Sequence, residues 1–122
     1  MIYTSYFGHI KNLPDNCEPI SICRWVPKWY KGQTFLPLAP STILIKWWIN
    51  SKKTKEDEEK YIKVFDEQLK KLNPKEIETI LIKKCGNKIP TLICYEGYDE
   101  FCHRHLVSEW FNNNGIKCKE IY

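Results

Sequence analysis

The segment at residues 89–95, IPTLICY, constrains the fold more than any other part of this chain, because it is apolar at almost every position. A strand with one face in water alternates apolar and polar residues, whereas a strand covered on both faces is apolar nearly throughout. Sheets covered on both faces are mostly parallel and carry helices on each side. The segment therefore predicts a buried strand in an α/β protein.

The rest of the sequence supplies the other elements of such a fold. Further strands are predicted at residues 2–7, 20–23 and 116–121, and helices are predicted to begin near Ser41, Thr54, Asn73 and Asp99. Thr54 with Asp57 makes a capping box, and Asn73 precedes a proline at the first helical position. This order predicts one α/β domain over residues 1–122. It is a small sandwich with a mostly parallel, roughly four-stranded sheet and flanking helices.

Composition restricts the classes of function. The chain is 43% hydrophobic, which excludes intrinsic disorder. Its net charge of +4 comes from seventeen lysines and only two arginines, Arg24 and Arg104. Proteins that read phosphates or guanines use arginine more heavily, so the composition disfavours a dedicated nucleic-acid binder. The longest apolar stretch, residues 43–49, is interrupted by Lys46 and is too short to cross a membrane.

Six cysteines would be compatible with disulfides in a secreted protein. The first ten residues, MIYTSYFGHI, lack the basic and long apolar regions of a signal peptide, so we expect a cytoplasmic chain with reduced cysteines. A zinc ion could use Cys94, Cys102 and either His103 or His105, but this spacing fits no standard zinc pattern. We therefore expect no metal and no other cofactor.

Two parts of the sequence carry residues suited to ligand chemistry. Ligands of α/β proteins bind beyond the carboxyl ends of strands, where helix N-termini attract anions. The candidates at such positions are Cys23 and Arg24 after one strand, Cys94, Tyr95 and Glu96 at the end of the buried strand, and Cys102, His103 and Arg104 in the opening turns of the next helix. Helical phase directs His103 towards the buried face. The alternative is that Cys102 and His103 only pack in the core, while Arg104 pairs with Glu96 or Glu100.

Residues 25–40 form an unusual segment, because prolines and Gly32 exclude a long helix or a central strand. Loops of this length inside a compact domain are usually functional or disordered, and the many aromatic residues argue against disorder. Trp25, Trp29, Tyr30 and Phe35 could stack on a flat ring while arginines hold its charged end. The same side chains could equally form a small core beneath the loop.

The segments ISICRWVPKWYKG, LAP and LICYEGYDEFCHRHLVSEWF together resemble the small bacterial and phage family known as domain of unknown function 488. The resemblance runs from Ile20 to Phe111, and its "CYE…FCHR…W" block is the specific part. It implies a compact α/β domain of mostly unassigned activity. The family pattern singles out the residues that match Arg24, Pro27, Cys94, Glu96, Cys102, His103 and Arg104. It supplies no reaction.

The leading hypothesis is a pocket for a small anionic ligand, of nucleotide type, in a protein that only binds, such as a phage-encoded sequestering protein. Arg24 and Arg104 would clamp the anion at the helix N-terminus. Glu96 and His103 would bond hydroxyl groups or a base. The remaining ligand-binding candidates are Trp25, Trp29, Tyr30, Cys94 and Tyr95.

The rival hypothesis is an enzyme that acts on a nucleotide or nucleic-acid substrate. Glu96, His103 and Cys102 are its candidate catalytic residues for hydrolysis or group transfer. The phosphatase type of loop, Cys-x5-Arg, is absent, since Glu100 stands six residues after Cys94. Nucleic-acid binding through the lysine-rich helices is a third hypothesis, and exposed aromatic residues would allow an oligomer.

Overall fold

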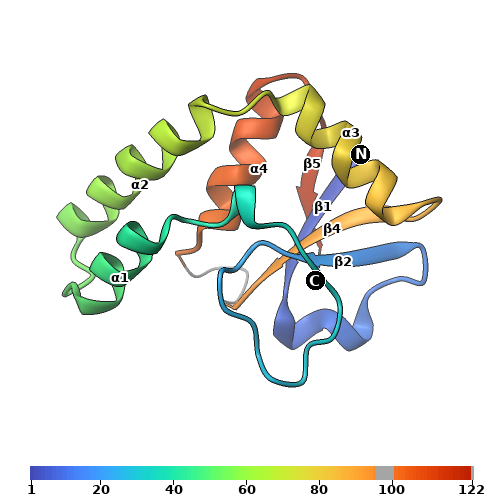
Figure 1. Ribbon diagram of the computed structural model, residues 1–122, viewed down its shortest axis with the longest axis horizontal. Helices are drawn as coiled ribbons and strands as arrows, with labels where there is room; N and C mark the ends of the chain where they lie inside the picture. Colours follow the sequence, from blue (N-terminus) through green and yellow to red (C-terminus); the bar gives the residue numbers. More distant parts are fainter. Residues whose placement is uncertain (96–100, 122) are drawn as a thin grey trace.

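The protein is built on a parallel sheet, which we describe from a computed structural model over residues 1–95 and 101–121. The strands of this sheet are β1 (Ile2–Tyr6), β2 (Cys17–Ser21), β3 (Gln33–Thr34), β4 (Ile89–Cys94) and β5 (Cys118–Glu120). They lie in the order β3-β2-β4-β1-β5, and each neighbouring pair is parallel (Figure 1). The predicted α/β class is confirmed. The sheet has one more strand than expected because β3, with two residues, is too short to show a periodicity.

In the described part of the chain, four α-helices flank the sheet: α1 (Thr42–Asn50), α2 (Lys55–Lys70), α3 (Pro74–Cys85) and α4 (His103–Asn113). Short 3-10 helices occur at η1 (Phe7–Asn12) and η2 (Leu36–Leu38). The predicted capping box is present, because the Thr54 hydroxyl accepts from the Asp57 N–H and the Asp57 carboxylate accepts from the Thr54 N–H. The Asn73 side chain accepts from the first free N–H groups of α3. These caps fix where α2 and α3 begin.

The core lies around β4, the central strand of the sheet. Its residues 90–94 are all buried, as the apolar sequence predicts. Helix α2 packs against α4, α4 packs on β1, β4 and β5, and α3 packs on β4. Figure 1 shows α1 and α2 together at one end of the molecule. Tyr61, Phe65 and Leu69, which recur at helical spacing, are the buried residues of α2.

The last helix begins later than the sequence predicts. Helix α4 starts at His103, and Cys102 is its N-cap residue with an extended backbone (φ −154°, ψ 145°). Cys102 therefore does not share the helical phase assumed for the opening turns. Apolar periodicity predicts where the middle of a helix lies, but it does not determine the residue at which the helix begins. Asp99, the expected start, lies outside the described residues.

Gly32 packs closely against the buried side chain of Tyr30, and this contact gives a first testable prediction. The Tyr30 hydroxyl donates to the backbone carbonyls of Pro19 and Gln33, which hold the ring in place. A Cβ atom on Gly32 would lie 2.6 Å from the Tyr30 hydroxyl oxygen. We expect Gly32→Ala to lower the free energy of unfolding by about 1–3 kcal/mol, the usual cost of overpacking, in urea denaturation.

The matched control for this prediction is Lys31→Ala, which changes the exposed neighbouring residue. Its effect should stay within about 0.5 kcal/mol, as for most surface substitutions. Equal stability of the two variants would contradict the close packing at Gly32.

Candidate functional site

The chain leaves two neighbouring strands side by side, at the carboxyl ends of the sheet. Strands β2 and β4 are neighbours, with Ser21 level with Ile93. The chain therefore leaves β2 through Ile22, Cys23 and Arg24 at the same edge where it leaves β4. The first residue of α4 also lies there, because the His103 side chain contacts the Ile22 carbonyl. The topology thus assembles the candidate residues from three distant segments.

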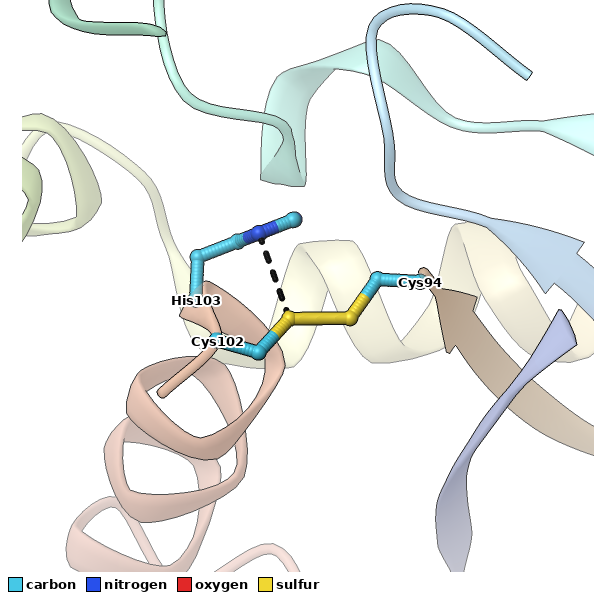
Figure 2. Close-up of side chains that lie close together, drawn as sticks. All are labelled: Cys94, Cys102 and His103. Atoms are coloured by element: carbon cyan, nitrogen blue, oxygen red, sulfur yellow. Dashed lines mark hydrogen bonds between the residues drawn. A yellow bond between two sulfur atoms is a disulfide. The ribbon is translucent and has the colours of Figure 1, made fainter. Parts of the chain in front are cut away.

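Cys94, Cys102 and His103 form the centre of this edge (Figure 2). Cys94 ends β4, Cys102 caps α4, and all three side chains are buried. The structure joins Cys94 and Cys102 in a disulfide. The expectation that every cysteine is reduced is therefore wrong for this pair, while Cys17, Cys23, Cys85 and Cys118 take part in no disulfide. A separation of eight residues gives no sequence signal for the pairing, which depends on α4 starting at the end of β4.

His103 is held in one tautomer by its surroundings. Its Nε2 atom lies 2.6 Å from the Ile22 carbonyl oxygen, which can only accept, so Nε2 carries the proton. The Nδ1 lone pair then faces the Cys102 Sγ atom at 3.7 Å. Burial lowers the pKa of His103 to about 4, and the ring packs edge-on against Phe65. At neutral pH His103 is thus a neutral imidazole with its free nitrogen beside a sulfur.

Arg104 lies on the other side of this cluster, and its side chain is fully buried. Its Nε and Nη2 atoms donate to the Glu120 carboxylate at 3.1 and 2.8 Å, and Nη1 donates to the Cys94 Sγ atom at 2.9 Å. Glu120 also accepts from the Thr4 hydroxyl. Among the described residues, the ion-pair partner of Arg104 is therefore on β5. The two glutamates considered from the sequence, Glu96 and Glu100, lie outside the described part of the chain.

A pocket of about 260 Å³ opens beside Cys102 and His103. Two cationic residues, Arg24 and Lys53, contribute to its lining. The aromatic residues that line it are Trp25, Trp48, Tyr61, Tyr95 and Phe101, and the other lining residues are Cys23, Pro40, Ile45 and Ile49. The pocket thus combines flat rings, positive charge and the Cys102–His103 pair.

The pocket contains some of the residues expected from the sequence and omits others. Arg24, Trp25 and Tyr95 line it, in addition to Cys102 and His103. Trp29 and Tyr30 instead pack edge-on against Phe7. Tyr30 belongs to a small buried cluster with Phe7, whereas Trp29 is 56% exposed. Cys94 and Arg104 lie behind the pocket and are not among its lining residues. Glu96, a candidate catalytic residue, lies outside the described residues.

Lys53 and Trp48 also line the pocket, although the sequence does not predict them as binding residues. Trp48 is near the end of α1, where its ring lies 5.0 Å from Phe101 and 5.2 Å from Tyr61. Lys53 follows α1 with a positive φ of 55°, and its Nζ atom lies 5.6 Å from the Trp48 ring. A lysine with a left-handed backbone between two helices gives no sequence signal. Their position depends on where α1 lies, and α1 packs against α2.

Taken together, the fold and site define a small α/β domain with a ligand-sized pocket at the carboxyl edge of a parallel sheet. A family model described as "Active DUF488-N3 subclade" matches residues 9–115. The chain belongs to this subclade of the DUF488 family, as the CYE…FCHR block predicts. No curated protein and no solved structure is significantly similar to the chain. Within the described residues, no helix is both long and apolar enough to span a membrane.

Proposed function

We propose that the pocket binds a small anionic ligand that carries a flat ring, of nucleotide type. The observation that carries this proposal is the combination of two cations, Arg24 and Lys53, with several aromatic rings around one cavity. Cations favour phosphate or carboxylate groups, and aromatic side chains stack on planar rings. A volume of about 260 Å³ is small for a ligand pocket, so it favours one nucleotide-sized molecule.

Arg24 is the residue best suited to hold the anion. Its Nε atom donates to the Pro40 carbonyl at 3.0 Å, which orients a half-buried side chain. Among the described residues, the other N–H groups of its guanidinium make no hydrogen bond, so they are available to a phosphate. Arginine binds such groups through two parallel hydrogen bonds. Arg104 has no part in this proposal, because its guanidinium contacts Glu120 and Cys94.

The aromatic side of the pocket can accept a ring from solvent. Trp25 is 50% exposed and Tyr95 is also 50% exposed, although both line the cavity. Trp48, Tyr61 and Phe101 form the deeper wall through mutual ring contacts. Exposed rings at the mouth and packed rings behind them suit a planar group that enters from solvent and stacks.

Arg24→Met tests the proposal. A panel of nucleoside monophosphates, diphosphates and cyclic nucleotides is first screened by thermal shift, and the best compound is measured by calorimetry. We expect the variant to bind about 10- to 150-fold more weakly, which corresponds to about 1.5–3 kcal/mol for a charge-assisted contact. The fold should stay intact, since Arg24 lies at the rim of the core.

The control is Lys28→Met, which removes an exposed cation from the same segment but not from the pocket. It should bind like the unchanged protein. If the panel gives no ligand, or if both variants bind equally well, the proposal that the pocket binds a nucleotide is wrong.

A second function, catalysis on the same ligand, is favoured by the Cys102–His103 contact. With Cys102 reduced, its thiol would lie at the pocket with the Nδ1 atom of His103 3.7 Å away as a hydrogen-bond acceptor, so Cys102 is the candidate nucleophile. The description of the subclade as active agrees with this alternative. One experiment distinguishes the two functions. The ligand is incubated with the reduced protein, the protein is denatured by heat, and the released ligand is analysed by chromatography. Unchanged ligand, with binding retained in Cys102→Ser, supports binding alone.

A further inference from the structure

We infer that the dithiol form of the protein binds one zinc ion, or a similarly soft divalent cation, through Cys94 Sγ, Cys102 Sγ and His103 Nδ1. The three ligand atoms lie within 4.8 Å of one another, and this is the group of potential metal ligands found in the part of the chain that the structure describes. The inference does not depend on which ligand the pocket takes.

One spacing among these ligand atoms already suits a tetrahedral ion. Zinc bonds of about 2.0–2.3 Å to nitrogen and sulfur place neighbouring ligand atoms roughly 3.3–3.8 Å apart. The 3.7 Å between Cys102 Sγ and His103 Nδ1 already falls in this range. The Cα atoms of Cys94 and Cys102 are 7.6 Å apart, beyond the about 4.4–6.8 Å usual for a disulfide. The backbone separation therefore leaves room for an ion between the two sulfurs.

The hydrogen-bond partners of the proposed ligands are also typical of a metal site. Histidine ligands nearly always donate their second ring N–H to a carbonyl or carboxylate, which aims the other nitrogen at the metal. His103 donates from Nε2 to the Ile22 carbonyl in this way. Arg104 donates from Nη1 to Cys94 Sγ and would stabilise its thiolate. Two thiolates would neutralise a divalent ion, as a buried site requires.

The start of α4 explains how consecutive residues can serve one ion. Within a helix, adjacent side chains diverge by roughly 100°. Cys102 precedes the helix with an extended backbone, so its side chain turns towards His103 instead of following the helical phase. Figure 2 shows Cys102 and His103 leaving the helix start and meeting Cys94 from the end of β4.

Three protein ligands leave a tetrahedral ion with one open position. Cys102 and His103 also line the pocket, whereas Cys94 lies behind it. The fourth position is therefore reached from the pocket, where water or an anionic group of a ligand would complete the coordination. Two cysteines, one histidine and an exchangeable group make a known ligand set of catalytic zinc, while structural zinc sites use four protein ligands.

The site exists only after the disulfide is reduced. A small dithiol gives two electrons and two protons to the Cys94–Cys102 bond, which yields two thiols and the cyclic disulfide of the reductant. Binding of the divalent ion then forms two metal–sulfur bonds and releases the two thiol protons. The disulfide form has no thiolate to offer and should bind no metal at this place.

Cobalt(II) titration of the reduced chain tests the inference, after removal of the dithiol without oxygen. We expect one ion per chain, with the cobalt–thiolate charge-transfer absorption and the strong visible bands of tetrahedral cobalt, and displacement by zinc. Cys94→Ser and Cys102→Ser should each weaken binding by at least ~100-fold, since each removes a ligand. Cys17→Ser and Cys85→Ser, at buried free cysteines, should bind normally.

A second measurement uses the unchanged chain and so does not depend on whether the variants fold. Zinc should slow alkylation of Cys94 and Cys102 at least ~10-fold, and leave the rates at Cys17 and Cys85 unaltered, in mass-spectrometric peptide maps. Absence of the thiolate band in the reduced chain, or equal alkylation with and without zinc, would overturn the site. Neither result bears on nucleotide binding, which the Arg24 experiment tests separately.

Discussion

Arg104→Met is expected to lower the free energy of unfolding by about 3–5 kcal/mol, the cost of breaking a buried ion pair by removing one partner. The Arg104 side chain is fully buried, and the Glu120 side chain is 18% exposed. Without the guanidinium, the carboxylate keeps only the Thr4 hydroxyl among the contacts described above, and Cys94 loses an N–H donor. Chemical denaturation followed by tryptophan fluorescence measures the change.

The exposed pair Lys70–Glu67 provides a matched control, since its side chains are 71% and 64% exposed. Lys70→Met should cost less than about 1 kcal/mol, as exposed ion pairs do. The double variant Arg104→Met with Glu120→Leu should recover much of the stability, because apolar replacement of both partners removes the unpaired charge. Equal losses for Arg104→Met and Lys70→Met would show that the buried pair does not stabilise the fold.

Phe65→Ala is expected to cost a similar amount, about 3–5 kcal/mol, because it leaves a cavity in the centre of the core. The Phe65 side chain is fully buried on α2, with its ring 6.1 Å from Tyr61 and 5.6 Å from His103. The edge-on contact with His103 means that the substitution also loosens the imidazole beside Cys102. Urea denaturation measures the stability, and metal or nucleotide binding measures the effect on the site.

Val64→Ala is the control for the core substitution, because Val64 is the preceding residue of the same helix and is 41% exposed. Its cost should stay near the 0.5 kcal/mol limit of most surface changes. A small loss for Phe65→Ala as well would mean that α2 is not anchored in the core through this ring.

Local signals account for the part of the fold that the sequence predicts correctly. Thr54 and Asn73 cap their helices through neighbours two or three residues away, so their role is visible in the sequence itself. The apolar run at residues 89–95 identifies β4, the central strand of the sheet, for the same reason. Strand β3 is not predicted and the start of α4 is predicted too early, because two paired residues and one extended N-cap leave no periodic pattern.

Long-range pairing accounts for the part of the site that the sequence does not predict. The sequence indicates the tripeptide Cys102-His103-Arg104, but Glu120, which pairs with Arg104, lies on β5 and reaches it because β5 pairs with β1. The same holds for Lys53, which joins the pocket through the fold of α1. A single sequence shows which residues are suited to binding or catalysis. The order of the strands decides which other side chains those residues contact.

The position of β1 has a consequence for how the protein is made. This strand pairs with β4 and β5, so Tyr3 lies beside Thr91 and Lys119. The ribosome releases β1 long before either neighbour has been synthesised, and contacts so distant in sequence slow folding. Until β4 and β5 are synthesised, β1 has neither of its strand partners. The sheet can close around β1 only after residues 118–120 of β5 have left the ribosome.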